Sequence, residues 1–239
     1  NHVATDELPL VYLQNSGLSN LVNSLLSLAS TEVYGISMLF MIGWREGPGL
    51  EDEPQHVHQG RVMVYMLHAL DVPVIILSED SIGAEQQTKL VATQARDIKG
   101  TVALVVRTGT FGEFKGVPQA SSDYLMSHEE AIISAASVLE DDAAVICTTR
   151  MASRELFESR ALSAVGHQRD FLTVVGMGHA NQIALGLPMV RPARSIYCFD
   201  GDGAALMHMG SMASIGKSGC VNLSHLVFNN GVHGSVSSQ

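Results

Sequence analysis

Short, fully apolar runs that alternate with amphipathic stretches are the feature that most constrains the fold of this chain. Strands buried on both faces consist of near-continuous Val, Ile and Leu, which is typical of parallel sheets covered by helices. The runs predicted as strands are 10–13, 37–42, 72–77, 102–106, 143–148, 195–199 and 223–228. The stretches predicted as helices are 17–30, 57–70, 82–98, 128–139, 152–160, 178–187 and 204–218. The alternation predicts an α/β protein built from doubly wound parallel sheets.

The chain is expected to form two such sheets, because its 239 residues exceed one typical domain and the pattern is interrupted near the middle. Gly, Pro and Ser without a strong period favour a linker there. We predict an N-terminal domain over 1–110, a linker over 111–127 and a C-terminal domain over 128–239. Ser127 is predicted to cap the first helix of the second domain, with Glu130 as its capping-box partner. Both domains are expected to be truncated, because the sequence opens almost directly on a strand-like run and stops without winding down.

Composition and charge exclude several classes of protein. A hydrophobic content of 46% with 16% charged residues is the opposite of what a disordered chain shows. The net charge of −10, without a Lys/Arg cluster, excludes a nucleic-acid partner. No run approaches the roughly 18 apolar residues needed to span a bilayer, so no membrane partner is expected. The cysteines are odd in number and lack metal-ligand spacing, which favours reduced thiols and a cytoplasmic location; they are Cys147, Cys198 and Cys220.

Two motifs follow the last two predicted strands. Asp200-Gly-Asp-Gly-Ala204 comes after the first of them, and Asn229-Asn-Gly231 comes after the second, about 25 residues later. The glycines permit a sharp turn, Asp202 offers the hard oxygen that Mg²⁺ prefers, and the helix predicted from 204 would offer N–H groups to an anion. The spacing matches one helix plus one strand, which would bring Asn230 beside Asp202 at the carboxyl edge of the sheet. Two unrelated loops are the alternative, and a nicotinamide dehydrogenase is disfavoured because no G-x-G-x-x-G follows an early strand.

The two motifs together resemble the signature of the thiamine-diphosphate enzymes. The resemblance implies that Mg²⁺ is bound by the side chains of Asp202 and Asn230 and by the main-chain carbonyl of Val232. The metal would in turn bind the diphosphate of the cofactor. Backbone contacts to the same phosphates would come from Gly201, Gly203 and Ala204.

Further segments narrow the resemblance to the phosphonopyruvate decarboxylases, with the sulfopyruvate decarboxylases as nearest relatives. The matching segments are Tyr12-Leu-Gln-Asn-Ser-Gly-Leu18, Gly43-Trp-Arg45, Asp52-Glu-Pro-Gln-His56, Gln59-Gly60, Ser153-Arg-Glu-Leu-Phe157 and Gly176-Met-Gly-His-Ala180. Together with the two motifs they cover essentially the whole chain. The implied arrangement is a pyrimidine-binding domain over 1–110 and a diphosphate- and Mg²⁺-binding domain over 128–239.

The resemblance implies a decarboxylase that uses thiamine diphosphate and Mg²⁺ to convert 3-phosphonopyruvate to phosphonoacetaldehyde and CO₂. This reaction belongs to phosphonate biosynthesis, including that of phosphonate antibiotics. The substrate would be a small anionic 2-oxo acid, and the family's active sites lie between chains, which implies a homo-oligomer. Sulfopyruvate as the substrate, or a non-catalytic cofactor-binding remnant or partner subunit, remain alternatives.

Met177 lies between two glycines after an apolar run that ends at Val175. By resemblance, Met177 is the bulky side chain that bends the cofactor, and backbone groups at Val175 and Gly176 contact the cofactor. The carbonyl near Val175 would accept a hydrogen bond from the cofactor's amino group. A core methionine is the alternative, because a flexible thioether often fills such a position.

Polar side chains after the first strand and in the acidic loop near 51–53 are candidate substrate contacts. A pocket like that of the family would use Gln14, Asn15 and Ser16 near the reacting substrate, although an ordinary polar turn also explains them. His56 could bind the anionic substrate or relay a proton, with His58 as its partner or as an ordinary helix-face residue. Arg45 could bind the phosphonate group of the substrate, or form a surface salt bridge with a nearby glutamate. His179 and His233 are further candidate donors.

Two departures from the family pattern bear on activity. The family's activating glutamate lies before the segment that begins this sequence, and Glu7 is not assigned its role. The 239-residue chain alone is therefore expected to bind the cofactor poorly and to turn over little. Arg150 and Val175 stand where relatives tend to have small residues, and this leaves the identity of the substrate open.

Overall fold

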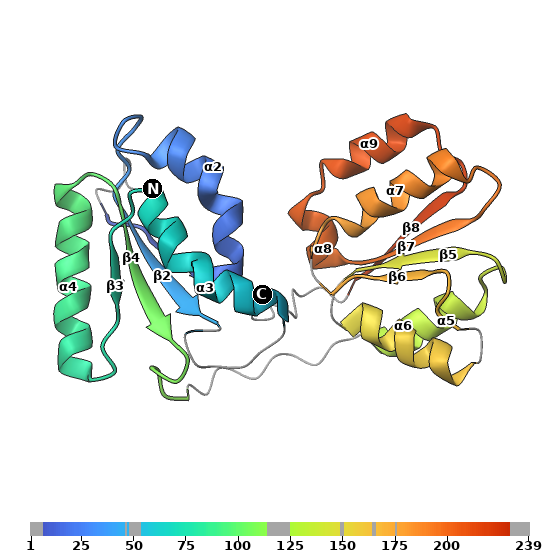
Figure 1. Ribbon diagram of the computed structural model, residues 1–239, viewed down its shortest axis with the longest axis horizontal. Helices are drawn as coiled ribbons and strands as arrows, with labels where there is room; N and C mark the ends of the chain where they lie inside the picture. Colours follow the sequence, from blue (N-terminus) through green and yellow to red (C-terminus); the bar gives the residue numbers. More distant parts are fainter. Residues whose placement is uncertain are drawn as a thin grey trace. The chain divides into compact units, whose positions relative to one another are not determined.

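The computed structural model describes residues 7–45, 47, 54–113, 125–148, 151–163, 166–174 and 176–229. The chain divides into two compact units, Asn1–Val117 and Pro118–Gln239, which are coloured blue to green and yellow to red in Figure 1. Of the predicted linker, residues 114–124 lie outside the described part of the chain. No described helix is both long and apolar enough to cross a membrane.

The first unit contains a four-stranded parallel sheet in the order β1-β2-β4-β3. Its strands are β1 (Leu10–Gln14), β2 (Met38–Trp44), β3 (Val74–Ile76) and β4 (Thr101–Arg107). Figure 1 shows α2 (Val22–Ser24) and α3 (Pro54–Ala69) on one face of the sheet and α4 (Ser81–Asp97) on the other. Residues 101–106 of β4 are all buried, as expected for a strand between two layers of helices.

Neighbouring residues of β2 point to opposite faces and form two separate cores in this unit. Phe40 and Ile42 pack with Met63 of α3, whereas Leu39 packs with Val91 of α4. Because side chains alternate along a strand, one apolar run can supply both cores.

The second unit also contains a four-stranded parallel sheet, in the order β6-β5-β7-β8, so its first strand along the chain lies inside the sheet and not at an edge. Its strands are β5 (Ala144–Cys147), β6 (Asp170–Leu172), β7 (Ile196–Gly201) and β8 (Leu223–Phe228). One face is covered by α5 (His128–Ser137) and α6 (Met151–Leu162), and the other by α7 (Ala180–Val190), as Figure 1 shows. The predicted fold class, two doubly wound parallel sheets, is confirmed for the described residues.

Two of the predicted helices are wrong in detail. The stretch 17–30 is not one α-helix but a 3₁₀ turn η1 (Asn15–Leu21), the single turn α2 and a π-helical turn η2 (Leu25–Ala29). The segment contains Gly17, Asn20 and Asn23, which are residue types of low helix propensity.

The predicted helix 204–218 is two helices, α8 (Asp202–Met207) and α9 (Ser211–Ser218). The break falls at His208–Gly210, and glycine is a poor helix former. The strand expected to run through 171–175 is also shorter, because β6 ends at Leu172.

The predicted capping box at the start of α5 is confirmed. Ser127 Oγ accepts a hydrogen bond from Glu130 N at 3.1 Å, and Glu130 Oε2 accepts one from Ser127 N at 2.7 Å. The same bonds hold the pKa of the Glu130 carboxyl below its ordinary value. Two N–H groups that the helix itself leaves unpaired are thereby satisfied.

We expect Ser127→Ala to lower the free energy of unfolding of the second unit by about 1 kcal/mol, because the cap is lost. Ser137→Ala is the matched control, since Ser137 is an exposed serine in the last turn of the same helix. Ser137→Ala should change the free energy of unfolding by no more than about 0.5 kcal/mol. Chemical denaturation of both variants provides the measurement, and equal losses would contradict a specific role for the cap.

Candidate active-site regions of the two units

The first motif of the second unit forms a turn at the carboxyl end of β7. The strand ends at Gly201 and α8 begins at Asp202, so the Asp202 carboxylate lies at the edge of the sheet. Gly203 N donates to Asp202 Oδ1 at 2.7 Å. A Cβ added at Gly201 would meet no described heavy atom within 4 Å, so the backbone there is open to a ligand. The turn can therefore present a hard carboxylate and backbone N–H groups together.

The Gly176–Gly178 turn packs against the backbone of this first motif. Gly178 has a φ of +81°, and a Cβ added there would lie 3.0 Å from the carbonyl oxygen of Ala204. The rings of His179 and His208 stack nearby, with centroids 4.4 Å apart and an interplanar angle of 24°. Met177 itself is half-buried, between two glycines of positive φ. The structure thus brings the predicted cofactor-bending segment next to Ala204.

The helix behind the motif differs from the prediction. A long helix from 204 was expected to direct its N-terminal N–H groups at an anion, but α8 has only six residues. The macrodipole of so short a helix is small. Any phosphate at this edge would therefore depend on the amides of the turn and on a bound cation.

The second motif follows the strand that is paired with β7. Gly201 lies opposite Phe228, the last residue of β8, so both strands end at the same edge of the sheet. The predicted ligands Asn230 and Val232, and the predicted cofactor contact Val175, lie outside the described residues. The pairing of β7 with β8 nevertheless fixes where the chain leaves the sheet ahead of Asn230.

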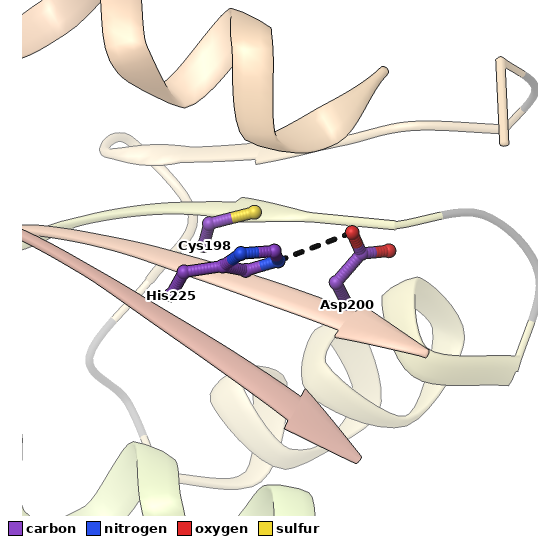
Figure 2. A group of neighbouring side chains, drawn as sticks. All are labelled: Cys198, Asp200 and His225. Carbon is purple, nitrogen blue, oxygen red and sulfur yellow. Dashed lines mark hydrogen bonds and ion pairs between the residues drawn. The ribbon is translucent and has the colours of Figure 1, made fainter. Parts of the chain in front are cut away.

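A buried group directly precedes the Asp202 turn. Asp200, with no exposed surface, accepts a hydrogen bond from Gly201 N at 3.1 Å, and its Oδ2 lies 3.2 Å from His225 Nε2. Figure 2 shows Cys198 beside this pair, and the three potential ligand atoms lie within 4.8 Å of one another. Burial, with a smaller contribution from the Asp200 charge, raises the pKa of the Cys198 thiol.

Sequence reasoning did not single out Asp200 or His225 as functional residues. A signal was present, because Cys198 and Asp200 are two residues apart on β7 and so share one face of the sheet. His225 is opposite Cys198 in the strand register, which the sequence does not reveal.

In the first unit, the polar turn after β1 lies beside the loop after β2. Asn15 is buried, donates from Nδ2 to Arg45 O at 3.0 Å and accepts from Arg45 N at 3.2 Å. Ser16 Oγ donates to Gln14 Oε1 at 2.7 Å. Gln14 is exposed and Ser16 is half-buried, both at the carboxyl edge of the sheet. Asn15 therefore ties the two loops together, while Gln14 and Ser16 present polar groups at that edge.

His56 lies in the first turn of α3 and is only 8% exposed. Its Nδ1 has no hydrogen-bond partner among the described residues, which is unusual for a buried nitrogen. His58, by contrast, is exposed and its Nδ1 lies 2.9 Å from Arg61 Nη2. The only tryptophan, Trp44, is buried and donates from Nε1 to Gly60 O at 2.9 Å, so it attaches β2 to α3. Of the two histidines, His56 is the one suited to meet a ligand.

The first unit also has an open depression at the carboxyl ends of β3 and β4. Asp80 in this depression caps α4 by accepting a hydrogen bond from Gly83 N at 2.7 Å. Two carboxylates face one cation here, so the depression does not suit an anionic substrate. Its lining residues are Ile76, Leu77, Ser78, Glu79, Asp80, Gln87 and Arg107.

We expect Gly178→Ala to lower the free energy of unfolding by about 2–3 kcal/mol, because it forces a side chain into a left-handed conformation and against the Ala204 carbonyl. Gly186→Ala in α7 is the matched control, since no described heavy atom lies within 4 Å of the added Cβ. That change should be neutral or stabilise the protein by up to about 1 kcal/mol. Chemical denaturation compares the two, and equal stabilities would refute the close packing of the turn.

The sequence of the chain is similar to those of known proteins. Residues 154–239 match the family described as thiamine pyrophosphate enzyme, C-terminal TPP binding domain. Over 95% of the chain the sequence is 32% identical to a phosphonopyruvate decarboxylase of Streptomyces viridochromogenes and 30% identical to one of Streptomyces hygroscopicus. It is 25% identical, over 97% of the chain, to a sulfopyruvate decarboxylase of Methanosarcina acetivorans.

The chain spans only part of these relatives: 59% and 58% of the two phosphonopyruvate decarboxylases and 62% of the sulfopyruvate decarboxylase. The similarity nevertheless extends over nearly the whole of this chain and includes both units. The resemblance predicted from the motifs is confirmed: this chain is similar to phosphonopyruvate and sulfopyruvate decarboxylases, and its residues 154–239 match the C-terminal domain of thiamine pyrophosphate enzymes.

Proposed function

We propose that this chain forms the cofactor- and substrate-binding part of a decarboxylase that depends on thiamine diphosphate and Mg²⁺. Its substrate is 3-phosphonopyruvate, and its products are phosphonoacetaldehyde and CO₂. The observation that carries the proposal is the packing of Gly178 against Ala204, because it brings the predicted cofactor-bending segment next to the turn with the predicted metal ligand.

The residues of the second unit fit the proposed cofactor. Asp202 supplies a hard oxygen for Mg²⁺, together with Asn230 and the carbonyl of Val232. The backbone is open at Gly201, where a Cβ would meet nothing described, so a diphosphate can approach the amides of the turn. Those contacts would come from Gly201, Gly203 and Ala204. The bound cofactor supplies an electron sink for the loss of CO₂.

The Gly176–Gly178 turn would orient the cofactor. Its two glycines have positive φ, and the stacked rings of His179 and His208 lie against it, so the backbone around Met177 is closely constrained. A side chain presented by such a turn can bend a flexible ligand without moving away. The Gly176 backbone and the Val175 carbonyl would contact the cofactor from the same segment.

The polar edge of the first unit would bind the substrate. Gln14 and Ser16 present hydrogen-bonding groups there, and the buried Nδ1 of His56 can accept or donate a proton when a ligand meets it. Asn15 fixes the backbone of Arg45, whose guanidinium suits a phosphonate. The first unit would thus be the pyrimidine-binding domain and the second the diphosphate-binding domain.

The proposed active sites lie between chains, so we propose a homo-oligomer. We also propose that the protein is cytoplasmic, which the three free cysteines support. Its proposed role is in phosphonate biosynthesis. Sulfopyruvate is the second candidate substrate, because the Methanosarcina acetivorans relative is similar over 97% of the chain. Phosphonate and sulfonate differ by about one charge, and discrimination at that level depends on individual contacts in the pocket.

We expect the full-length protein that carries this sequence to release CO₂ from phosphonopyruvate faster than from sulfopyruvate or pyruvate when Mg²⁺ and thiamine diphosphate are present. The three substrates are compared by kcat/KM under identical conditions. A preference for sulfopyruvate would establish the second candidate. Cofactor binding without turnover of any of the three would instead indicate a non-catalytic binding protein.

We expect Asp202→Asn to weaken Mg²⁺ binding at least about 100-fold in the presence of thiamine diphosphate, because the charged ligand is lost. Calorimetric titration of Mg²⁺ measures the affinity directly. Asp142→Asn is the matched control, since it removes an exposed carboxylate from a turn before β5 in the same unit. Equal affinities in the two variants would show that the metal binds elsewhere.

A further inference from the structure

We infer that Asp200 and His225 are positioning residues that hold the Asp202 turn in the geometry needed to bind Mg²⁺. The inference rests on the proposed function, because it assumes that the turn is the metal site. It concerns two residues that do not themselves reach the metal in this arrangement but control the backbone from which Asp202 projects.

The contact joins the two strands that lead into the two halves of the motif. Asp200 in β7 is paired with Val227 in the strand register, whereas His225 in β8 is paired with Cys198. The bond from His225 Nε2 to Asp200 Oδ2, 3.2 Å, therefore runs diagonally between neighbouring strands (Figure 2). Asp200 is the penultimate residue of β7 and His225 lies three residues before the end of β8, so the contact resists separation of the two strands near the edge where the metal would bind.

The other oxygen of the carboxylate acts on the turn directly. Asp200 Oδ1 accepts a hydrogen bond from Gly201 N at 3.1 Å, and Gly201 is covalently joined to Asp202. One side chain thus links a neighbouring strand, through His225, to the amide at the start of the turn. A glycine has wide backbone freedom, and this bond restricts it at Gly201.

Burial makes the imidazole necessary for this arrangement. Asp200 has no exposed surface, and a buried carboxylate is costly unless its oxygens are hydrogen-bonded. His225 keeps only 14% of its side chain exposed and supplies a polar partner to Oδ2. Without the His225 imidazole, the Asp200 carboxylate would rotate toward another hydrogen-bond donor, and its bond to the amide of Gly201 would be lost.

A metal ion shared by Cys198, Asp200 and His225 is less consistent with the same geometry. Both Asp200 oxygens are already hydrogen-bonded, one to Gly201 N and one to His225 Nε2. Cys198 instead belongs to the apolar cluster under α7, with Ala184 and Ile146. The Cys198 sulfur packs beside Asp200 and His225, and these two residues hold the Asp202 turn in place.

The test compares three variants of the full-length protein. His225→Phe removes the polar nitrogens but keeps a ring, and His225→Gln keeps an N–H donor. His167→Phe is the matched control, because His167 Nδ1 lies 3.6 Å from Oδ2 of another buried carboxylate, that of Asp170. Asp170 is the first residue of β6, and His167 lies three residues before it. A phenyl ring there can keep the stack on Phe157, whose ring centroid is 4.1 Å from that of His167.

Two measurements distinguish a positioning role from a purely structural one. In calorimetric titrations with thiamine diphosphate present, His225→Phe should weaken Mg²⁺ binding about 10- to 100-fold, the effect expected for a residue that orients a metal ligand. His225→Gln should recover most of the affinity, and His167→Phe should leave it unchanged. Without any ligand, the Gly201 amide should exchange slowly in the wild type and the control, and faster in His225→Phe.

Unchanged Mg²⁺ affinity and unchanged Gly201 exchange in His225→Phe would overturn the inference and leave the proposed function intact. A wild-type protein that binds neither Mg²⁺ nor thiamine diphosphate would overturn the proposed function and this inference together. If His225→Phe does not fold, the wild type still decides the matter. Slow exchange of its Gly201 amide then supports the inference, and exchange at the rate of an exposed amide refutes it.

Discussion

The parallel pairing of β7 with β8 is the constraint on which the candidate metal site depends. In a parallel sheet both strands end at the same edge, so Gly201 and Phe228 lie side by side although 26 positions separate them in the sequence. A turn after each strand then places its polar side chains at one edge. Asp202 is described at that edge, and β8, which precedes the second motif, ends beside it. The candidate metal site thus depends on the sheet rather than on any one loop.

The first unit uses the carboxyl edge of its own sheet in a different way. β1 and β2 end together, and Asn15 makes both of its described hydrogen bonds to the backbone of Arg45. The Asn15 side-chain amide therefore joins the two loops. Gln14 and Ser16 are left as the polar groups that this edge of the sheet presents. Trp44, at the end of β2, is buried and bonded to α3, so it holds the helix that carries His56. Both sheets are parallel and four-stranded, but the order of their strands differs and their edges present different chemistry.

Much of this organisation could be predicted from the sequence, and particular residues show where prediction stops. Strands such as β4 are apolar on both faces, and that pattern survives any error of register. The Ser127–Glu130 capping box depends on residues three apart, so local sequence contains all of it. The Asp200–His225 contact depends instead on which residue of β8 lies opposite which residue of β7. The irregular segment from Asn15 to Ala29 was also missed, and it contains Gly17, Asn20 and Asn23, which are residue types of low helix propensity.

The break between α8 and α9 illustrates how a departure from regular structure can serve a site. In an unbroken helix over 202–218, His208 would keep helical backbone angles, whereas it has φ −132° and ψ 45°. In that conformation its ring stacks on His179, and its Cδ2 would lie 2.7 Å from a Cβ at Gly178. The close approach is possible only because Gly178 has no side chain. The loss of helical hydrogen bonds at 208–210 is thus offset by the contacts that His208 makes with the Met177 turn. These contacts hold the turn against the start of α8. The segment proposed to bend the cofactor and the turn proposed to bind its metal are therefore kept together.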